Sequence, residues 1–135
     1  MDPIRNIATG TICLLDAIGG LLTLFGLSAS YLFFNEHFGW TLGCFQIVIW
    51  YVLLLNLFSW FNFIFIKPYK YIPLFILSIA NLGYCLAIGI AIKAACLVAT
   101  PITTAYFLIE TLIILSLAVL EWKRARQIKN ELAAH

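Results

Sequence analysis

The chain has 135 residues, of which 64% are apolar, 16% aromatic and only 10% charged, and its formal net charge is +2. Its mean hydropathy is +1.03, whereas a soluble domain is about 45–50% apolar and about 25% charged. So few charges exclude a water-soluble globular domain, a disordered chain and a nucleic-acid-binding module. The composition predicts an integral membrane protein.

Four long apolar segments follow one another along the chain. Residues 7–34 contain one charged residue, residues 38–66 and 71–92 contain none, and residues 94–120 contain one. A membrane-spanning helix needs about 20 mostly apolar residues, and the segments lack the alternation of polar and apolar residues that a β-barrel requires. We therefore predict an all-α membrane protein, an up-down four-transmembrane-helix bundle. It forms one domain, with helices over about 7–34, 39–66, 72–95 and 102–122 and a short basic cytoplasmic tail over 123–135.

Lysine and arginine are distributed unequally between the two ends of the predicted bundle. Only Lys93 falls on the side away from the chain termini. The seven on the side of the termini are Arg5, Lys67, Lys70, Lys123, Arg124, Arg126 and Lys129. Cytoplasmic loops carry the excess of positive charge, so we expect both termini in the cytoplasm, in a bacterial inner (plasma) membrane. The subunits of any oligomer are expected to be parallel.

The cysteines and histidines form no metal or redox motif. The four cysteines lie in or beside the apolar segments without CxxC spacing; they are Cys13, Cys44, Cys85 and Cys96. Cys44 and Cys96 both lie toward the predicted outer face, where an oxidising compartment would allow a disulfide, but we favour free cysteines packed as small apolar side chains. His37 and His135 cannot ligate a haem inside the bundle. We expect no cofactor, no metal ion and no nucleic-acid partner.

Each predicted helix carries one strongly polar residue near its middle. At a rise of 1.5 Å per residue, each lies about 14–15 Å from the cytoplasmic edge, in the middle of a hydrocarbon core about 30 Å thick. The four residues are Asp16, Asn56, Asn81 and Glu110. Polar residues of transmembrane helices normally face other helices. We therefore predict one polar layer inside the bundle or at a subunit interface, and we assign it as the candidate substrate- or ion-binding site.

An ionised carboxyl group in the middle of a membrane is costly, and three interpretations of this layer compete. Asp16 and Glu110 could bind a cation or cationic substrate, with the asparagine carbonyl groups as further ligands. They could instead share one proton. As a third interpretation, both are protonated and hydrogen-bond the asparagines as structural contacts, worth about 0.6 kcal/mol each.

Three functions of different classes follow from the layer. The one we favour is a transporter or channel subunit for protons, cations or a small cationic or lipidic substrate. Four short helices rarely enclose a pathway, so a parallel homo-oligomer is implied. The second is a non-catalytic accessory or assembly subunit that binds a larger membrane partner. The third, a membrane enzyme with Asp16 or Glu110 as acid or base, is weakest because the sequence offers no nucleophile–base pair. We expect no enzymatic activity.

Overall fold

The described residues form helices joined by short connections. The computed structural model describes residues 3–65, 70–94, 97–98 and 100–134, and the side chains from residue 9 onward within these ranges. The helices are α1 (Pro3–Leu32), the one-turn α2 (Asn35–Phe38), α3 (Leu42–Phe65), α4 (Ile72–Lys93) and α5 (Pro101–Ala133). The four long helices are long and apolar enough to cross a membrane, and no strand occurs in the described ranges. The expected class of all-helical membrane protein is confirmed.

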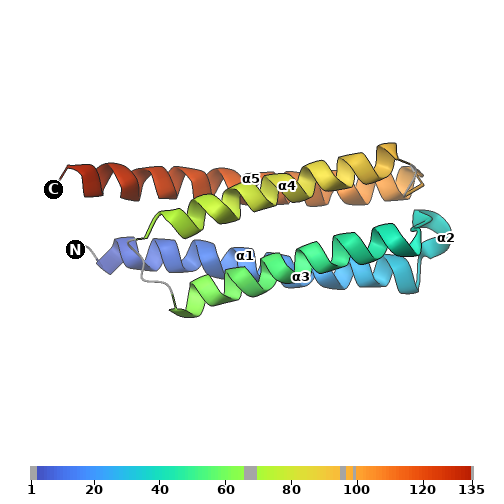
Figure 1. Ribbon diagram of the computed structural model, residues 1–135, viewed down its shortest axis with the longest axis horizontal. Helices are drawn as coiled ribbons and strands as arrows, with labels where there is room; N and C mark the ends of the chain where they lie inside the picture. Colours follow the sequence, from blue (N-terminus) through green and yellow to red (C-terminus); the bar gives the residue numbers. More distant parts are fainter. Residues whose placement is uncertain (1–2, 66–69, 95–96, 99, 135) are drawn as a thin grey trace.

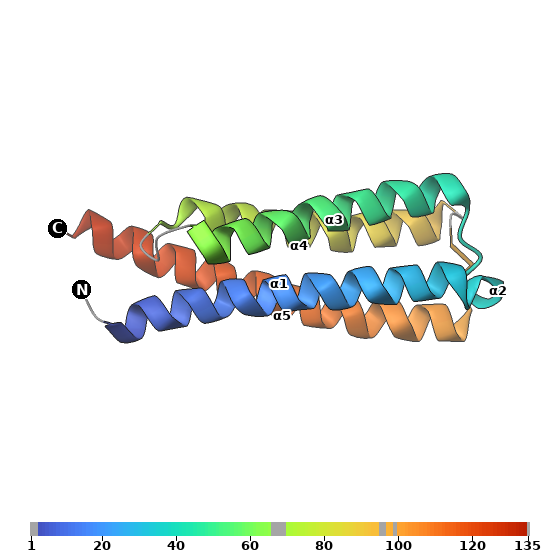
Figure 2. The same cartoon turned by 90° about the horizontal axis from the view of Figure 1, so that it is seen from below.

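The four long helices lie side by side along the long axis of the molecule (Figure 1). Figure 2 shows the order around the bundle: α1 lies beside α3 and α5, and α4 lies beside the same two helices. The closest packing is that of α1 on α3 and of α4 on α5. Both chain ends lie at one end of the bundle and α2 lies at the other (Figure 1). In this arrangement α1 and α4 face each other diagonally across the interior.

Local sequence signals account for the starts of the later helices. Proline stands in the first turn of both α4 and α5, where the missing N–H has no helical partner in any case. Thr100 caps α5 by accepting a hydrogen bond from the backbone N–H of Thr103 at 3.2 Å. The short α2 ends at Gly39, whose φ of 60° is left-handed and therefore favours glycine.

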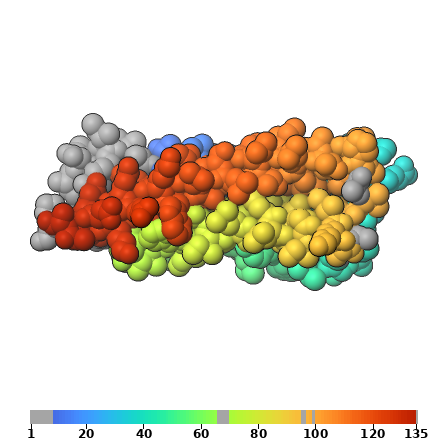
Figure 3. All heavy atoms as spheres, turned by 90° about the horizontal axis from the view of Figure 1, so that it is seen from above, coloured from blue at the N-terminus to red at the C-terminus, as the bar shows by residue number. Residues whose placement is uncertain are grey.

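The outer surface of the bundle is apolar. Large hydrophobic side chains point outward from every long helix, among them Phe25 (73% exposed), Ile47 (73%) and Leu86 (69%). Figure 3 shows the face formed by α4 and α5, which run next to each other along the length of the molecule. A water-soluble protein rarely exposes so much contiguous apolar surface, so this surface suits contact with lipid.

The end of the bundle at α2 is closed by hydrogen bonds between segments. The indole Nε1 of Trp40 donates to Ser30 Oγ at 2.9 Å, and the hydroxyl groups of Thr100 and Thr103 each donate to the His37 carbonyl oxygen at 3.0 Å. The backbone N–H of Val98 donates to the Phe38 carbonyl oxygen at 2.8 Å. These contacts join the α1–α3 connection to the start of α5.

The structure corrects the expectation that all four cysteines are free. Cys44 forms a disulfide bond, whereas Cys13 and Cys85 are free thiols. Cys96, which the sequence offered as a possible partner of Cys44, lies outside the described residues. Cys44 and Cys96 both come from apolar segments of the sequence. Apolar neighbours in the sequence cannot distinguish a buried thiol from a disulfide.

The segment expected to be a basic cytoplasmic tail is a continuation of α5. This helix extends to Ala133, and two of its residues beyond 122, Ala125 and Ile128, are fully buried. They pack with Cys13 of α1 and Leu74 of α4. The interior of the bundle therefore continues past the expected end of the fourth span.

One glycine of α1 is required by the approach of α3. A Cβ added to Gly20 would lie 3.1 Å from Cγ and 3.2 Å from Cβ of Asn56, and closer still to its Nδ2. Atoms near the Asn56 backbone cannot move aside without moving α3. Gly10 of the same helix has no such neighbour among the described residues, because a Cβ there meets none of their atoms within 4 Å.

We predict that Gly20→Ala destabilises the protein by about 1–3 kcal/mol through overpacking. Gly10→Ala is the matched control, and it should be neutral or stabilising by up to about 1 kcal/mol because alanine favours the helix. Thermal unfolding in detergent, followed by circular dichroism, measures both. Equal melting temperatures for the two variants would contradict the close packing of α1 on α3.

Candidate functional site

Four polar side chains, one from each long helix, meet in the centre of the bundle. Asp16 of α1 accepts hydrogen bonds from Ser59 Oγ of α3 and, at 2.8 Å, from Asn81 Nδ2 of α4. The same Asn81 Nδ2 lies 3.2 Å from Glu121 Oε2 of α5, to which it also donates. The exposed fractions of these four side chains are between 0% and 4%. We call Asp16, Ser59, Asn81 and Glu121 the central polar cluster.

The residues of the predicted polar layer divide between two places. Asp16 and Asn81 are hydrogen-bonded to each other, although their helices lie diagonally across the bundle. Asn56 is close by, and its Nδ2 donates to the carbonyl oxygen of Ala17 at 2.7 Å. Glu110 lies elsewhere. On α5 it is about three helical turns from Glu121, which occupies the position beside Asp16 that the prediction gave to Glu110.

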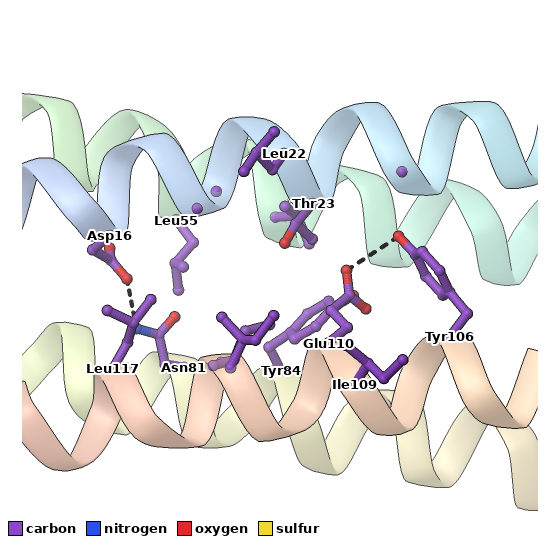
Figure 4. Close-up of a pocket in the computed structure, with 16 residues that line it drawn as sticks. Asp16, Leu22, Thr23, Leu55, Asn81, Tyr84, Tyr106, Ile109, Glu110 and Leu117 are labelled. Atoms are coloured by element: carbon purple, nitrogen blue, oxygen red, sulfur yellow. Dashed lines mark hydrogen bonds between the residues drawn. The ribbon is translucent and has the colours of Figure 1, made fainter.

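Glu110 is the acceptor of a second, smaller polar group. Tyr84 of α4 donates its hydroxyl to Glu110 Oε2 at 2.9 Å, and Tyr106, one turn away on α5, donates to Oε1 at 3.4 Å. Figure 4 shows Thr23 of α1 facing this carboxyl group across the bundle. Gly26 of α1 makes room for the Tyr106 ring, since a Cβ there would collide with the Tyr106 hydroxyl group.

A cavity of about 330 Å³ connects the two polar groups. Asp16 and Asn81 lie at one end of it, and Glu110, Tyr84 and Tyr106 lie at the other (Figure 4). The wall between them is apolar. It is formed by Gly19, Gly20, Leu22, Val52, Leu55, Ile109, Ile113, Ile114 and Leu117, with Thr23 and Gly26 on α1.

The cavity reaches the outer surface between α1 and α5. Most of its lining residues belong to these two helices, which pack less closely on each other than either packs on its main partner. Three of the lining side chains are also largely exposed: Leu22 (67%), Ile109 (60%) and Ile113 (57%). The cavity is therefore bordered by side chains that also form part of the apolar outer surface.

Glu121 is a member of the site that sequence reasoning missed, because it lies near the end of the predicted fourth helix (102–122), and only a polar residue near the middle of each helix was assigned to the layer. The structure buries it completely. The spacing of residues in the sequence contained a signal. Four residues follow one another at intervals of three and four positions: Ala118, Glu121, Ala125 and Ile128. All four are buried on one face of α5. Such spacing marks the interior face of a helix and places Glu121 on it.

Two buried polar groups in or near the central polar cluster have no hydrogen-bond partner among the described residues. One is Glu121 Oε1, and the other is the side-chain amide of Asn62, whose Oδ1 and Nδ2 are both unpaired. Asn62 is 3% exposed and lies one helical turn from Ser59 on α3, toward the end of the bundle that holds the termini. Unpaired buried polar atoms are uncommon in native proteins, so these atoms have hydrogen-bonding capacity that the described residues do not use.

The described residues contain no group of three or more histidine, cysteine, aspartate or glutamate side chains arranged to hold a metal ion. Comparison with protein-family models, with curated proteins and with solved structures finds no match to this chain. The protein belongs to the class of integral membrane proteins, with four candidate membrane-spanning helices among the described residues. Its function is inferred from the residues of the site.

The contribution of the central polar cluster to stability can be tested with two serines of the same chemistry. Ser59 Oγ hydrogen-bonds the buried Asp16 and also the Leu55 carbonyl oxygen, whereas Ser116 Oγ is exposed and bonds only within its helix, to the Leu112 carbonyl oxygen. We predict that Ser59→Ala lowers the free energy of unfolding by about 1–3 kcal/mol, because a buried acceptor loses its donor. Ser116→Ala should change it by less than about 0.5 kcal/mol. Denaturant unfolding in detergent measures both, and equal effects would show that Asp16 does not depend on Ser59.

Proposed function

We propose that the protein is a small membrane transporter or transporter subunit whose cavity binds a lipophilic organic cation taken up from the bilayer. The observation that carries this proposal is the position of the carboxyl groups. Glu110 and Asp16 stand at opposite ends of a cavity whose remaining wall is largely apolar. A cation with an apolar body is the ligand that matches both the negative groups and the apolar wall.

The size and the aromatic lining support the same class of ligand. Small-molecule sites usually have volumes of about 300–1,000 Å³, and this cavity of about 330 Å³ lies at the lower end. Tyr84 and Tyr106 line the wall beside Glu110. Aromatic faces attract organic cations by about 0.5–2 kcal/mol, so the tyrosines would add to the attraction of the carboxylate while their hydroxyl groups hold it in position.

The lateral mouth supports entry from the membrane. Leu22, Ile109 and Ile113 are apolar and exposed at the gap between α1 and α5, whereas the cavity ends at the central polar cluster on the side toward the termini. Passage across the bilayer then needs a rearrangement of the helices or a second subunit. We propose a parallel homo-oligomer for this purpose, with a larger membrane partner as the alternative.

We also propose that both termini are cytoplasmic, as in a bacterial inner membrane. By their positions in the sequence, seven lysine and arginine residues fall on the side of the termini, against Lys93 alone on the other side. The disulfide at Cys44 supports the same orientation, since Cys44 lies near the start of α3, close to α2, and disulfides persist in oxidising compartments.

Reporter fusions test this orientation. A fluorescent protein that matures only in the cytoplasm, joined after residue 134, should fluoresce, and alkaline phosphatase at the same position should be inactive because its disulfides do not form there. The same two reporters placed after Glu36 in α2 should give the opposite pattern. Active phosphatase after residue 134 would contradict the proposed orientation.

Binding of methyltriphenylphosphonium to the protein in nanodiscs, measured by isothermal titration calorimetry, tests the proposed function. We predict saturable binding to the wild type. Glu110→Gln should weaken the affinity about tenfold to a hundredfold, because the cation loses its interaction with a charged, hydrogen-bonded group in an apolar site. Glu36→Gln is the matched control, because it removes an identical charge from an exposed position in α2, and it should leave the affinity unchanged.

Two results would count against a cation-binding transporter. Equal affinities of wild type and Glu110→Gln would show that the phosphonium ion is held elsewhere. Absence of saturable binding to a correctly folded wild type would favour the other expected role, a non-catalytic accessory subunit, and copurification with a membrane partner would then be the next measurement.

A further inference from the structure

Asp16 belongs to two sites at once. Its carboxyl group is part of the central polar cluster through Ser59 and Asn81, and it also lines one end of the cavity. Glu121 is in the cluster but is not among the residues that line the cavity. A change in the charge of the cluster therefore changes the electrostatic potential in the cavity, because Asp16 belongs to both.

The two carboxyl groups of the cluster have few hydrogen-bond donors between them. Two buried carboxyl groups receive hydrogen bonds from the two N–H groups of a single amide, that of Asn81. If both were ionised, the unpaired Glu121 Oε1 would be a buried anionic oxygen without a donor, which is strongly unfavourable in an apolar interior. A proton bound to the pair removes one of the two charges and leaves the hydrogen bonds intact.

The other groups that face the pair are few among the described residues. From α1 the thiol of Cys13 lies one turn away and is buried. From α5 Arg124 lies one turn beyond Glu121, and its Nε donates to Thr9 Oγ1 at 3.0 Å. From α3 and α4 the polar groups at this level are neutral; they are Ser59, Asn62, Ser78 and Asn81. Glu110 faces the opposite end of the cavity (Figure 4).

We infer that the proton held by Asp16 and Glu121 and the organic cation in the cavity compete, so that binding of the cation releases the proton. The inference rests on the proposed function and adds to it a coupling ion. A positive charge in the cavity stabilises ionised Asp16, and ionised Asp16 attracts the cation. One positive charge enters as one leaves, so the charge inside the bundle does not change and each ligand is exchanged for one proton.

The unpaired amide of Asn62 suggests the side on which the proton is exchanged. It is the next buried polar side chain of α3 beyond Ser59, in the direction of the chain termini. The cavity mouth lies on the other side of Asp16, between α1 and α5. Under this proposal the proton and the cation reach Asp16 from different directions.

The experiment measures proton release during binding. Methyltriphenylphosphonium is added to the wild-type protein in nanodiscs in weakly buffered solution containing a pH indicator, and the protons released are divided by the ligand bound. We expect a release approaching one proton per ligand at a pH where the pair is protonated. Over that range the affinity should rise by about tenfold per pH unit, because the released proton is a product of binding.

Three variants locate the source of the proton. Glu121→Gln keeps an amide in place of the carboxyl group but leaves Asp16 without a carboxyl partner, so proton release should be lost and the affinity should no longer depend on pH. Glu110→Gln should bind more weakly yet release the same number of protons per bound ligand. Glu36→Gln, outside both sites, should behave as the wild type does.

The outcomes separate the two proposals. If the wild type shows no saturable binding, the proposed function fails and the coupling fails with it. If the wild type binds the cation without proton release and with an affinity independent of pH, the proposed function stands and the coupling is wrong. The wild-type measurement decides this even if Glu121→Gln does not fold. Loss of proton release in Glu110→Gln instead would assign the exchanged proton to Glu110 and overturn the role of the Asp16–Glu121 pair.

Discussion

A buried carboxyl group in an apolar bundle must obtain its hydrogen bonds from other helices, and this requirement on Asp16 organises the interior. Lipid supplies no donors, and the helix that carries Asp16 has already used its own backbone N–H groups. Ser59 of α3 and Asn81 of α4 donate to the carboxyl group, and Asn81 extends the contact to Glu121 of α5. One acidic side chain thus brings a polar residue of every long helix to the same level.

The surface of α1 decides where the bundle is tight and where it is open. Gly20 allows Asn56 to reach the α1 backbone, and Gly26 makes room for the Tyr106 ring. Between these two contacts the glycine-rich face leaves space that α5 does not fill, and this space is the cavity. The small residues that let α3 pack closely therefore also create a site open toward α5. Close packing on one side and an open cavity on the other arise from the same stretch of helix.

Part of this interior could be predicted from particular residues. An apolar segment of sufficient length predicts a spanning helix. Asp16 and Asn81, as polar residues of such helices, are expected to face other helices, and the structure joins them directly. Equal depth in the membrane could not establish that Asp16 lies beside Glu110. The estimate of depth takes no account of helix tilt or of the shift of one helix along another. The structure separates Glu110 from the cluster and puts Glu121 in it. For the same reason the sequence offered a disulfide of Cys44 only as the less favoured alternative, since pairing depends on which loops meet.

By itself, the sequence determined the class of protein, the number of long helices and the face of each helix that carries polar groups, because hydropathy and helical periodicity are local properties of the chain. Tertiary structure alone decided which helices are neighbours, how far each is shifted along the next, and hence which carboxyl groups meet. It also created the cavity, which belongs to no single segment. These features depend on contacts between residues far apart in the chain, such as Asp16 with Asn81, and no local pattern records them.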